Sequence, residues 1–352
     1  MADGGRIRAE HPFAYRGREK NHGSQRRGVR SWRIIMKTML VVVAAAAGLL
    51  AASATSHAAA PSIIVVGGKP VQRVAPLVVD KGRILVPLRA LADSLGASTT
   101  WNQAAKTATV RKWSETVTLI AGKNTAYSVK ANQTHKVTLD ASAKLVHNRV
   151  YVPLRFLARL YGYQVAASGD TAFVDSSLTA SEQAALYKGD LAKARQFVMD
   201  KGPKNAHYAN KPIPYSHERE GFETTYFFPI GEANRFFLIT DDTVSFYEVK
   251  DDFFVVTWQA RIPVGQKDTD QLFLEGKVTD AAGTKPAIKR EFFFSRTSGL
   301  VTSTNITAGK IGPDGKTAVT GVKRIVGDEV KEASGSLALT LPNEVRAEAT
   351  KE

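Results

Sequence analysis

The residues with the clearest potential for chemistry are the histidines and carboxylates of one long loop. His207 is followed by Tyr208, and segment 217–220 reads His-Glu-Arg-Glu shortly before Glu223. Imidazole and carboxylate groups together could ligate a metal or act as general acid and base. The spacing matches no zinc pattern, so we expect solvated loop residues with no metal and no cofactor.

Three acidic pairs could bind calcium if the fold brought them together. They are Asp241-Asp242, Asp251-Asp252 and Asp268-Thr-Asp270. None has the spacing of a calcium-binding loop, and aspartate is a favoured turn residue. We therefore interpret these pairs as turn formers.

The sequence lacks the common signatures of nucleophilic catalysis. It contains no cysteine and no Gly-x-Ser-x-Gly motif, and it has no glycine-rich phosphate loop. We expect no enzyme activity. The alternative is a secreted hydrolase whose acidic and histidine residues, around 207–223, follow no known motif.

The elements around these residues include a repeat. Residues 82–96 and 148–162 share eight of fifteen positions at an offset of 66, including Val-Pro-Leu-Arg in both copies. In each copy we expect a hairpin strand, a proline that starts a short helix, and a glycine that ends it. A repeat of this kind predicts a duplicated strand–hairpin–helix domain over residues 62–175.

Arg89 and Arg155 occupy equivalent sites in the first turns of the two predicted helices. As bidentate donors they could bind an anionic polymer. The other interpretation is that each guanidinium ties a neighbouring strand or carboxylate to the helix start. We favour this second role, because a positive charge near a helix N-terminus needs local compensation.

The tandem Gly-Arg-x-x-Val-Pro-Leu-Arg-x-Leu-Ala units resemble the copper amine oxidase N-terminal-like (stalk) domain of secreted bacterial proteins. Asn148 replaces the first glycine in the second copy. The resemblance implies an accessory domain remote from copper. Catalysis in that family needs an Asn-Tyr pair and a His-x-His pair, and the sequence has neither. Amine oxidase activity is therefore not expected.

The N-terminus predicts export. Residues 36–58 have a short basic start, an apolar run from Leu40 to Ala52 and a small-x-small cleavage site at Ser56-His57-Ala58, which is typical of a signal peptide. Residues 1–35 are then a disordered basic leader or the product of a start codon assigned too early. We expect a secreted or extracellular protein, associated with the cell wall, with no membrane span after cleavage.

The net charge of the chain is +15, of which residues 1–60 contribute +7. A mildly basic mature chain suits an anionic cell-wall or extracellular polymer as partner more than nucleic acid, although ordinary solubility also explains it. Without cysteines there are no disulfides, so stability must come from buried apolar surface.

The second half predicts a helix and then only strands. A capping box at Thr179 begins a helix over about 181–200, and residues 176–221 form a helix and loop linker. Residues 222–345 form an antiparallel meander, either sandwich or barrel-like, or a sheet backed by the helix. Nine strands are expected: 222–228, 235–240, 243–250, 253–262, 271–281, 287–296, 300–308, 318–326 and 334–341.

Aromatic doublets in these strands place rings on both faces of the sheet, which favours a core role. Tyr208, Tyr215 and Trp258 are better candidates for an exposed ligand surface. We thus predict an α+β protein in which a stalk-like module carries a β-domain. That domain binds a polymer or another ligand without catalysis, and a carrier of an apolar ligand is a further alternative.

Overall fold

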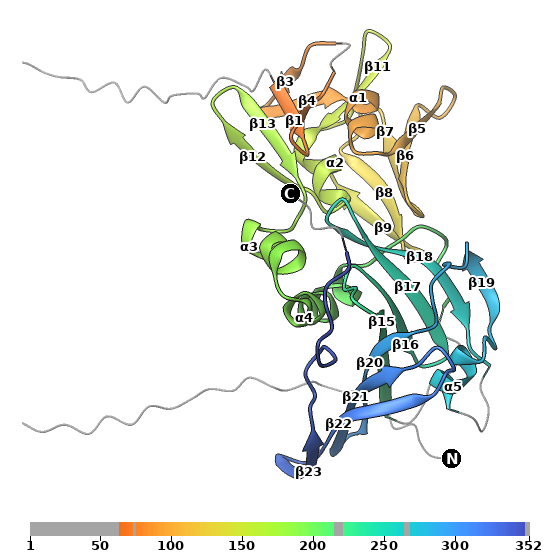
Figure 1. Cartoon of the computed structure of the whole chain (residues 1–352). Helices are drawn as coiled ribbons and strands as arrows, with labels where there is room; N and C mark the ends of the chain where they lie inside the picture. The colour runs from red at the N-terminus through yellow and green to blue at the C-terminus, as the bar shows by residue number, and fades with distance from the viewer. Residues whose placement is uncertain (1–62, 73–74, 215–220, 264–267, 349–352) are drawn as a thin grey trace, which may run out of the picture. The chain divides into compact units, whose positions relative to one another are not determined.

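The computed structural model describes residues 63–72, 75–214, 221–263 and 268–348 (Figure 1). The predicted leader and signal peptide, as well as Tyr215 and His217, lie outside the described residues. Residues 57–352 form one compact unit. Its class is α+β, as predicted, with many strands and few helices. No helix in the described part of the chain is long and apolar enough to cross a membrane.

The duplicated region consists of short strands and two short helices, α1 (Leu88–Ser94) and α2 (Leu154–Leu160), each with one apolar face. Its strands are β1 Ile63–Val66, β2 Lys69–Pro70, β3 Val78–Asp80, β4 Arg83–Pro87, β5 Ser98–Asn102, β6 Thr107–Lys112, β7 Glu115–Ile120, β8 Thr125–Lys130, β9 Gln133–Thr138, β10 Lys144–Val146, β11 Arg149–Pro153, β12 Gln164–Ser168 and β13 Thr171–Asp175. They form three sheets, ordered β12-β13-β1-β2, β10-β11-β4-β3 and β5-β6-β7-β8-β9.

The two copies of the repeat meet in one sheet. Strands β4 and β11 pair antiparallel with Val152 opposite Val86, so the Val-Pro-Leu-Arg motifs lie side by side. Each proline is the last residue of its strand and directly precedes the helix. Gly96 and Gly162 adopt φ of 68° and 80° after the helices, in the left-handed region that glycine reaches without strain. The predicted start and end of both helices are confirmed.

Two features of this region differ from the prediction. The hairpin β8–β9 was not expected, because Thr125–Thr138 is polar and its strands alternate weakly. Strand β1 pairs in parallel with β13, which joins the beginning of the region to its end and was not apparent from local sequence. Both helices bury their apolar faces in a common core with β1, β6 and β7.

The predicted linker helix is interrupted. The capping box at Thr179 is present and starts α3 (Ala180–Gln183). A π-helical turn, η1 (Ala184–Lys188), follows, and the chain then breaks at Gly189 before α4 (Leu191–Lys201). Asp190 caps α4 by accepting a hydrogen bond from the Lys193 N–H, so a second N-terminus replaces the continuous helix. A 3₁₀ turn, η2 (Pro203–Asn205), ends the segment.

The C-terminal region is a single open sheet with strand order β14-β18-β17-β16-β15-β20-β21-β22-β23, and β19 also pairs with β18. Its strands are β14 His207–Tyr208, β15 Phe222–Pro229, β16 Arg235–Thr240, β17 Thr243–Lys250, β18 Phe253–Arg261, β19 Thr279–Gly283, β20 Phe292–Leu300, β21 Ser303–Ile311, β22 Thr317–Val326 and β23 Glu329–Gly335. The first and last strands do not pair. Among the sandwich, the closed barrel and the backed sheet, the structure is the backed sheet.

Two predicted strands of this region are wrong. Of the strand expected over 334–341, only residues 334–335 lie in a strand, because β23 ends at Gly335. In place of a strand over 271–281, the chain forms the helix α5 (Thr269–Leu274) and then the strand β19. The Asp268 carboxylate accepts a hydrogen bond from the Asp270 N–H and so caps α5. The apolar residues Leu272, Phe273 and Leu274 pack against the sheet from this helix.

Both faces of the sheet are covered, as the aromatic doublets predict. On one face, η1 and α4 cover a core that includes Phe228, Phe236 and Phe293. On the other face, α5 and the segment after it cover Phe227, Phe237 and other rings. The two cores use alternate residues of the same strands, because successive side chains of a strand point to opposite faces.

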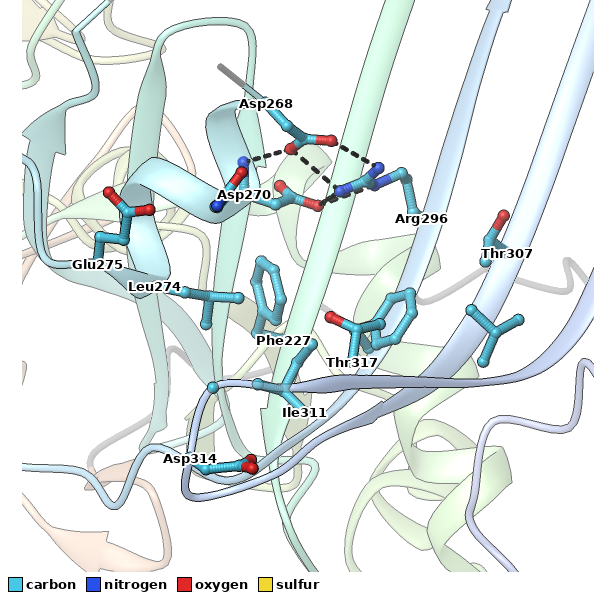
Figure 2. Close-up of a pocket in the computed structure, with 14 residues that line it drawn as sticks. Phe227, Asp268, Asp270, Leu274, Glu275, Arg296, Thr307, Ile311, Asp314 and Thr317 are labelled. Atoms are coloured by element: carbon cyan, nitrogen blue, oxygen red, sulfur yellow. Dashed lines mark hydrogen bonds and ion pairs between the residues drawn. The ribbon is translucent and has the colours of Figure 1, made fainter.

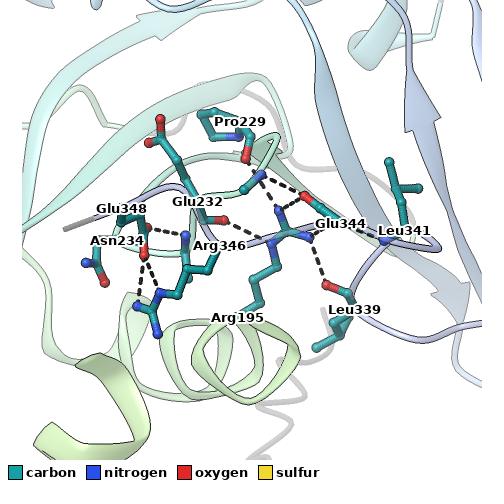
Figure 3. Close-up of polar contacts among 11 residues, drawn as sticks. Arg195, Pro229, Glu232, Asn234, Leu339, Leu341, Glu344, Arg346 and Glu348 are labelled. Carbon is teal, nitrogen blue, oxygen red and sulfur yellow. Dashed lines mark hydrogen bonds and ion pairs between the residues drawn. The ribbon is translucent and has the colours of Figure 1, made fainter. Parts of the chain in front are cut away.

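The C-terminal segment 336–348 closes the face that carries α4 (Figure 3). Arg195 of α4 is fully buried and makes an ion pair of 2.7 Å with Glu344. Its guanidinium also donates to the carbonyl oxygen of Leu339, 2.9 Å away. Arg346 donates to the carbonyl oxygen of Gly189 at the break before α4. Segment 336–348 is thus part of the fold.

Candidate functional site

Among the described residues, His207 and Glu223 do not come together, and His217 lies outside the described residues. The His207 ring is buried, its Nδ1 lies 2.8 Å from Glu115 Oε1, and the ring centroid lies 4.1 Å from that of Trp113. Glu223 lies elsewhere, beside Asp268 and Asp270. Contrary to the expectation of a solvated loop residue, His207 has a packing role between two aromatic strand ends.

The acidic pairs divide between two roles. Asp241, Asp251 and Asp252 have positive φ angles in hairpin turns, which confirms turn chemistry there. The buried Asp252 carboxylate also accepts hydrogen bonds from Tyr187 and Gln183. Asp268 and Asp270 differ, since they begin α5 and their side chains face a cleft.

Two of the predicted ligand-surface aromatics are less accessible than expected. Trp258 is 2% exposed and belongs to the core under α5, so the expectation of an exposed ring is wrong. Its position on a central strand, β18, between two covered faces explains this. Tyr208 is half-buried, and burial raises its pKa. Tyr215 is outside the described residues.

Arg89 and Arg155 are both exposed on the first turns of α1 and α2. Neither guanidinium makes a hydrogen bond or an ion pair with the described residues. The expected ties to a strand or carboxylate are therefore absent from this part of the chain. The two other arginines of the repeat do have partners: Arg83 Nε lies 3.0 Å from Asp140, and Arg149 also has an interaction partner.

The most developed site is a cleft of about 570 Å³ between α5 and strands β15, β20, β21 and β22 (Figure 2). We call it the acidic cleft. Its polar lining includes Asp268, Asp270 and Arg296, with Glu275 and Asp314 farther along. A cleft of this size can hold a small molecule or a short stretch of polymer.

Strand register explains how distant residues meet in the acidic cleft. Arg296 of β20 lies opposite Thr225 of β15 on one side and Thr307 of β21 on the other. Two residues along the strand, Phe294 lies opposite Phe227. One row of cross-strand neighbours is thus polar and the adjacent row on the same face is aromatic.

Arg296 connects the carboxylates of the cleft. Its Nε donates to Asp270 Oδ2 at 2.8 Å, and its Nη1 donates to Asp268 Oδ2 at 3.0 Å. Its Nη2 also donates to both carboxylates, and Glu223 Oε1 lies 3.7 Å from Nε. Three carboxylates therefore surround one guanidinium, an arrangement that leaves excess negative charge.

Several acceptors behind this ion pair are unsatisfied. Asp270 Oδ1, Glu223 Oε1 and the Thr225 hydroxyl are buried and have no hydrogen-bond partner. The Thr225 hydroxyl lies close enough to Asp270 to lower its pKa without forming a hydrogen bond of ordinary geometry. Buried polar atoms without partners are uncommon in folded proteins, so this group is not a purely structural network.

The environment of Asp270 favours its neutral form. Burial raises the pKa of Asp270 to about 6, Arg296 lowers it in part, and the charge of Asp268 raises it further. Asp270 is 4% exposed, whereas the Asp268 side chain is 44% exposed. The two carboxyl groups thus differ in solvation although both face the same cleft.

Hard divalent cations prefer carboxylate oxygens of the kind that Glu223, Asp268 and Asp270 supply, which lie within 4.8 Å of one another. The Arg296 guanidinium already occupies the space that these oxygens share. Any cation would have to draw Asp268 away from Arg296. The apolar side chains that line the rest of the cleft favour an organic cation over a hydrated metal ion.

The remaining wall of the acidic cleft is apolar. It is made by Phe227, Leu274, Phe294, Ile311 and Val319. The ring of Phe294 lies against Gly309, where a Cβ atom would come within 2.8 Å of it. Val319 is 55% exposed at the mouth. The cleft therefore places the Asp268–Asp270–Arg296 group beside an apolar wall, with the carboxylates of Glu275 and Asp314 farther along its lining.

Sequence reasoning found only part of this site. The sequence indicates Asp268-Thr-Asp270 only as a turn, and it brings Glu223 to notice only as a possible partner of the loop histidines, for which solvated loop residues are the expectation. The signal that points to the cleft is the alternation Glu223, Thr225, Phe227 on one face of β15. Arg296 and Thr307 join that face only through strand register, which the local sequence does not specify.

The comparisons with known proteins agree with the architecture of the first region. A module of two strand–helix repeats defines a duplicated α+β domain. Residues 65–175 match the family model of the copper amine oxidase N-terminal domain, whereas the C-terminal region matches no family model. No curated protein matches the chain.

Proposed function

We propose that the protein is a secreted, non-enzymatic component of the cell envelope. In this proposal the copper amine oxidase N-terminal domain is a stalk-like module, and the C-terminal sheet binds a ligand. The observation that supports it is the acidic cleft, which combines a volume of about 570 Å³ with unsatisfied polar atoms beside it.

Binding is favoured over catalysis by the state of the two aspartates. Both oxygens of Asp268 and one oxygen of Asp270 accept hydrogen bonds from Arg296. The other oxygen of Asp270 is buried from solvent. A general acid or base must reach the proton that it transfers. Asp270 cannot do so in this arrangement because its remaining oxygen is buried, and Asp268 becomes available only when a ligand draws it away from Arg296.

A secreted hydrolase is the second candidate, and one observation favours it. Asp268 and Asp270 face one cleft in different environments, and the pKa of Asp270 is raised to about 6. Differently tuned carboxyl groups in one cleft are a common feature of acid–base sites. Hydrolysis of polysaccharide or peptide that is lost in both Asp268→Asn and Asp270→Asn would establish this function in place of binding.

An apolar carrier is less well supported. The aromatic cavity beside Trp258 and Phe273 holds only about 60 Å³. Ligand pockets usually measure at least about 300 Å³. This cavity is thus much smaller than the usual pocket for an apolar ligand.

We propose that an anionic cell-wall or extracellular polymer contacts the N-terminal module. Arg89 and Arg155 support this, because both are exposed and neither pairs with the described residues. The acidic cleft itself repels a polyanion. The two surfaces would therefore have separate ligands, with the polymer holding the protein at the envelope and the cleft open to another molecule.

A comparison of two valine variants tests ligand binding in the cleft. Val319→Trp would fill the mouth of the cleft, and Val330→Trp on the edge strand β23 is the matched control, since both valines are about half exposed. Thermal shifts of the full chain would be measured with a panel of cationic, neutral and anionic small molecules. The proposal requires a ligand whose shift survives Val330→Trp and is lost in Val319→Trp. If Val319→Trp changes no ligand response, the cleft is not a binding site.

A further inference from the structure

The lining of the acidic cleft indicates the charge of its ligand. Four carboxyl groups and one guanidinium line it, so it carries three formal negative charges when Asp270 is ionised. The chain as a whole has a net charge of +15. A negative cleft in a basic protein concentrates cations locally and disfavours anions.

The unsatisfied acceptors indicate how a cation can be accommodated beside Arg296. Arg296 donates two hydrogen bonds to Asp268, the most exposed carboxylate of the group. Glu223 Oε1 lies 3.7 Å from Arg296 Nε and has no hydrogen-bond partner. When a ligand cation takes over Asp268, the guanidinium can turn its released donors to Glu223. The half-buried Glu223 carboxylate, through its buried Oε1, therefore compensates Arg296 for the lost partner.

The buried Thr225 hydroxyl is a second, independent sign of a ligand-dependent arrangement. Thr225 is fully buried, its hydroxyl has no partner, and it lies opposite Arg296 across the strand pair. An unpaired buried hydroxyl is costly. The hydroxyl approaches Asp270 closely enough to lower the Asp270 pKa, yet Asp270 Oδ1 also has no partner of ordinary hydrogen-bond geometry. A shift of Arg296 can supply a donor to either atom.

The apolar wall indicates the body of the ligand. Phe227, Leu274 and Phe294 line the cleft on the side of the aspartates, and Ile311 and Val319 continue the wall away from them. A hydrated metal ion gains nothing from such a wall, whereas a hydrocarbon stem gains from each buried methylene group. Aromatic faces also attract an ammonium group.

From these observations, and resting on the proposed binding function, we propose that the acidic cleft binds a primary ammonium group on an apolar stem. The ammonium group pairs with Asp268, and the stem lies along Phe227, Phe294 and Val319. The same chemistry is found in a free alkylamine and in the lysine side chain of a cationic peptide. A comparison of hexylammonium with a lysine-containing peptide distinguishes these two sources.

Isothermal titration of the full chain tests the ligand class. Hexylammonium is compared with hexanol and hexanoate at about 50 mM salt, where charge interactions are weakly screened. We expect only hexylammonium to bind. Asp268→Asn should weaken binding by about tenfold, since it removes a charge-assisted hydrogen bond, and Glu223→Gln should weaken it less. The control Glu329→Gln, on the exposed edge strand, should have no effect.

The peptide arm uses a short peptide with one lysine and the same peptide with its lysine acetylated. If the peptide binds more tightly than hexylammonium and loses binding on acetylation, the source is a lysine side chain. If hexylammonium binds more tightly, it is a free amine.

Three outcomes would overturn the inference. Binding of hexanol or hexanoate that Val319→Trp abolishes would contradict the ammonium class and leave the proposed function standing. Tight binding of calcium that Asp268→Asn abolishes, without binding of hexylammonium, would identify a metal site. If no probe of any charge responds to Val319→Trp, the ligand class and the proposed function both fail.

Discussion

Arg195 Nη2 lies 2.7 Å from Glu344 Oε1 across 149 residues of sequence, and both side chains are almost fully buried. The pair joins helix α4 to the C-terminal segment on one face of the sheet (Figure 3). The backbone N–H groups of Gly231 and Leu341 also donate to the Glu344 carboxylate. This buried pair is therefore fully hydrogen-bonded, and it fastens the C-terminal segment to α4.

We expect Arg195→Met to lower the free energy of unfolding by about 3–5 kcal/mol, because it leaves the Glu344 charge buried and unpaired. Lys193→Met on the same helix is the control. The Lys193 side chain is 75% exposed in its pair with Asp190, so its loss should cost at most about 1 kcal/mol. Urea denaturation of both variants gives the comparison. Equal effects would show that the buried pair does not hold the C-terminal segment.

The equivalent glycines of the repeat should respond differently to alanine. Both Gly96 and Gly162 have positive φ, so each substitution carries a strain of about 1–2 kcal/mol. A Cβ at Gly96 would meet no atom within 4 Å, whereas at Gly162 it would lie 3.3 Å from the Phe253 ring. Gly162→Ala should therefore lower the melting temperature more than Gly96→Ala does. The reverse order would mean that Phe253 does not pack against the second repeat.

Arg89 and Arg155 should matter for polymer binding and not for stability. Neither arginine pairs with the described residues. In the double variant Arg89→Ala/Arg155→Ala, each substitution should therefore change the free energy of unfolding by less than about 0.5 kcal/mol. Retention on purified cell wall at low salt should fall. Arg83→Ala, which removes a pair with Asp140, is the control that should keep retention. Unchanged retention in the double variant would remove these arginines from the interface.

The raised pKa of Asp270 predicts a particular pH dependence. Because the pKa is about 6 in the folded protein and 3.8 is its ordinary value, the folded state binds this proton more tightly than the unfolded state does. The contribution is stabilising at pH below about 4 and is lost as the pH rises through about 6. Relative to Asp270→Asn, the wild type should lose up to about 3 kcal/mol over this range.

Denaturation of the two proteins at several pH values measures this difference directly. The neighbouring groups Glu223, Asp268 and Arg296 are common to both proteins, so their titration largely cancels in the comparison. A difference that stays constant between pH about 4 and about 7 would show that Asp270 is ionised throughout.

The local sequence contains most of the N-terminal module and most of the strands. The Val-Pro-Leu-Arg pair predicts both helices, because proline and glycine restrict the backbone at defined positions. The hairpin strands 235–240 and 243–250 are predicted at their observed bounds, because Asp241 and Asp242 mark the turn between them. These signals act over a few residues and need no tertiary information.

The acidic cleft depends on information that the local sequence lacks. Residues 271–281 were predicted as a strand from their apolar content, and the structure forms α5 there because Asp268 caps the helix and Phe273 is buried on the sheet. Arg296 meets Asp268 only after β20 pairs with β15. Trp258 is buried because α5 and the segment after it cover its face of the sheet. This cover forms only in the assembled sheet, so the local sequence does not show it.

A crystal structure of the protein with 6-bromohexylammonium is the most direct test of the central claim. We expect the ammonium nitrogen to lie within about 3 Å of the Asp268 carboxylate and the bromine to lie on the wall formed by Ile311 and Val319. We also expect Arg296 to turn toward Glu223. Bromine density outside the cleft, or an empty cleft at a concentration that saturates binding in solution, would contradict the account.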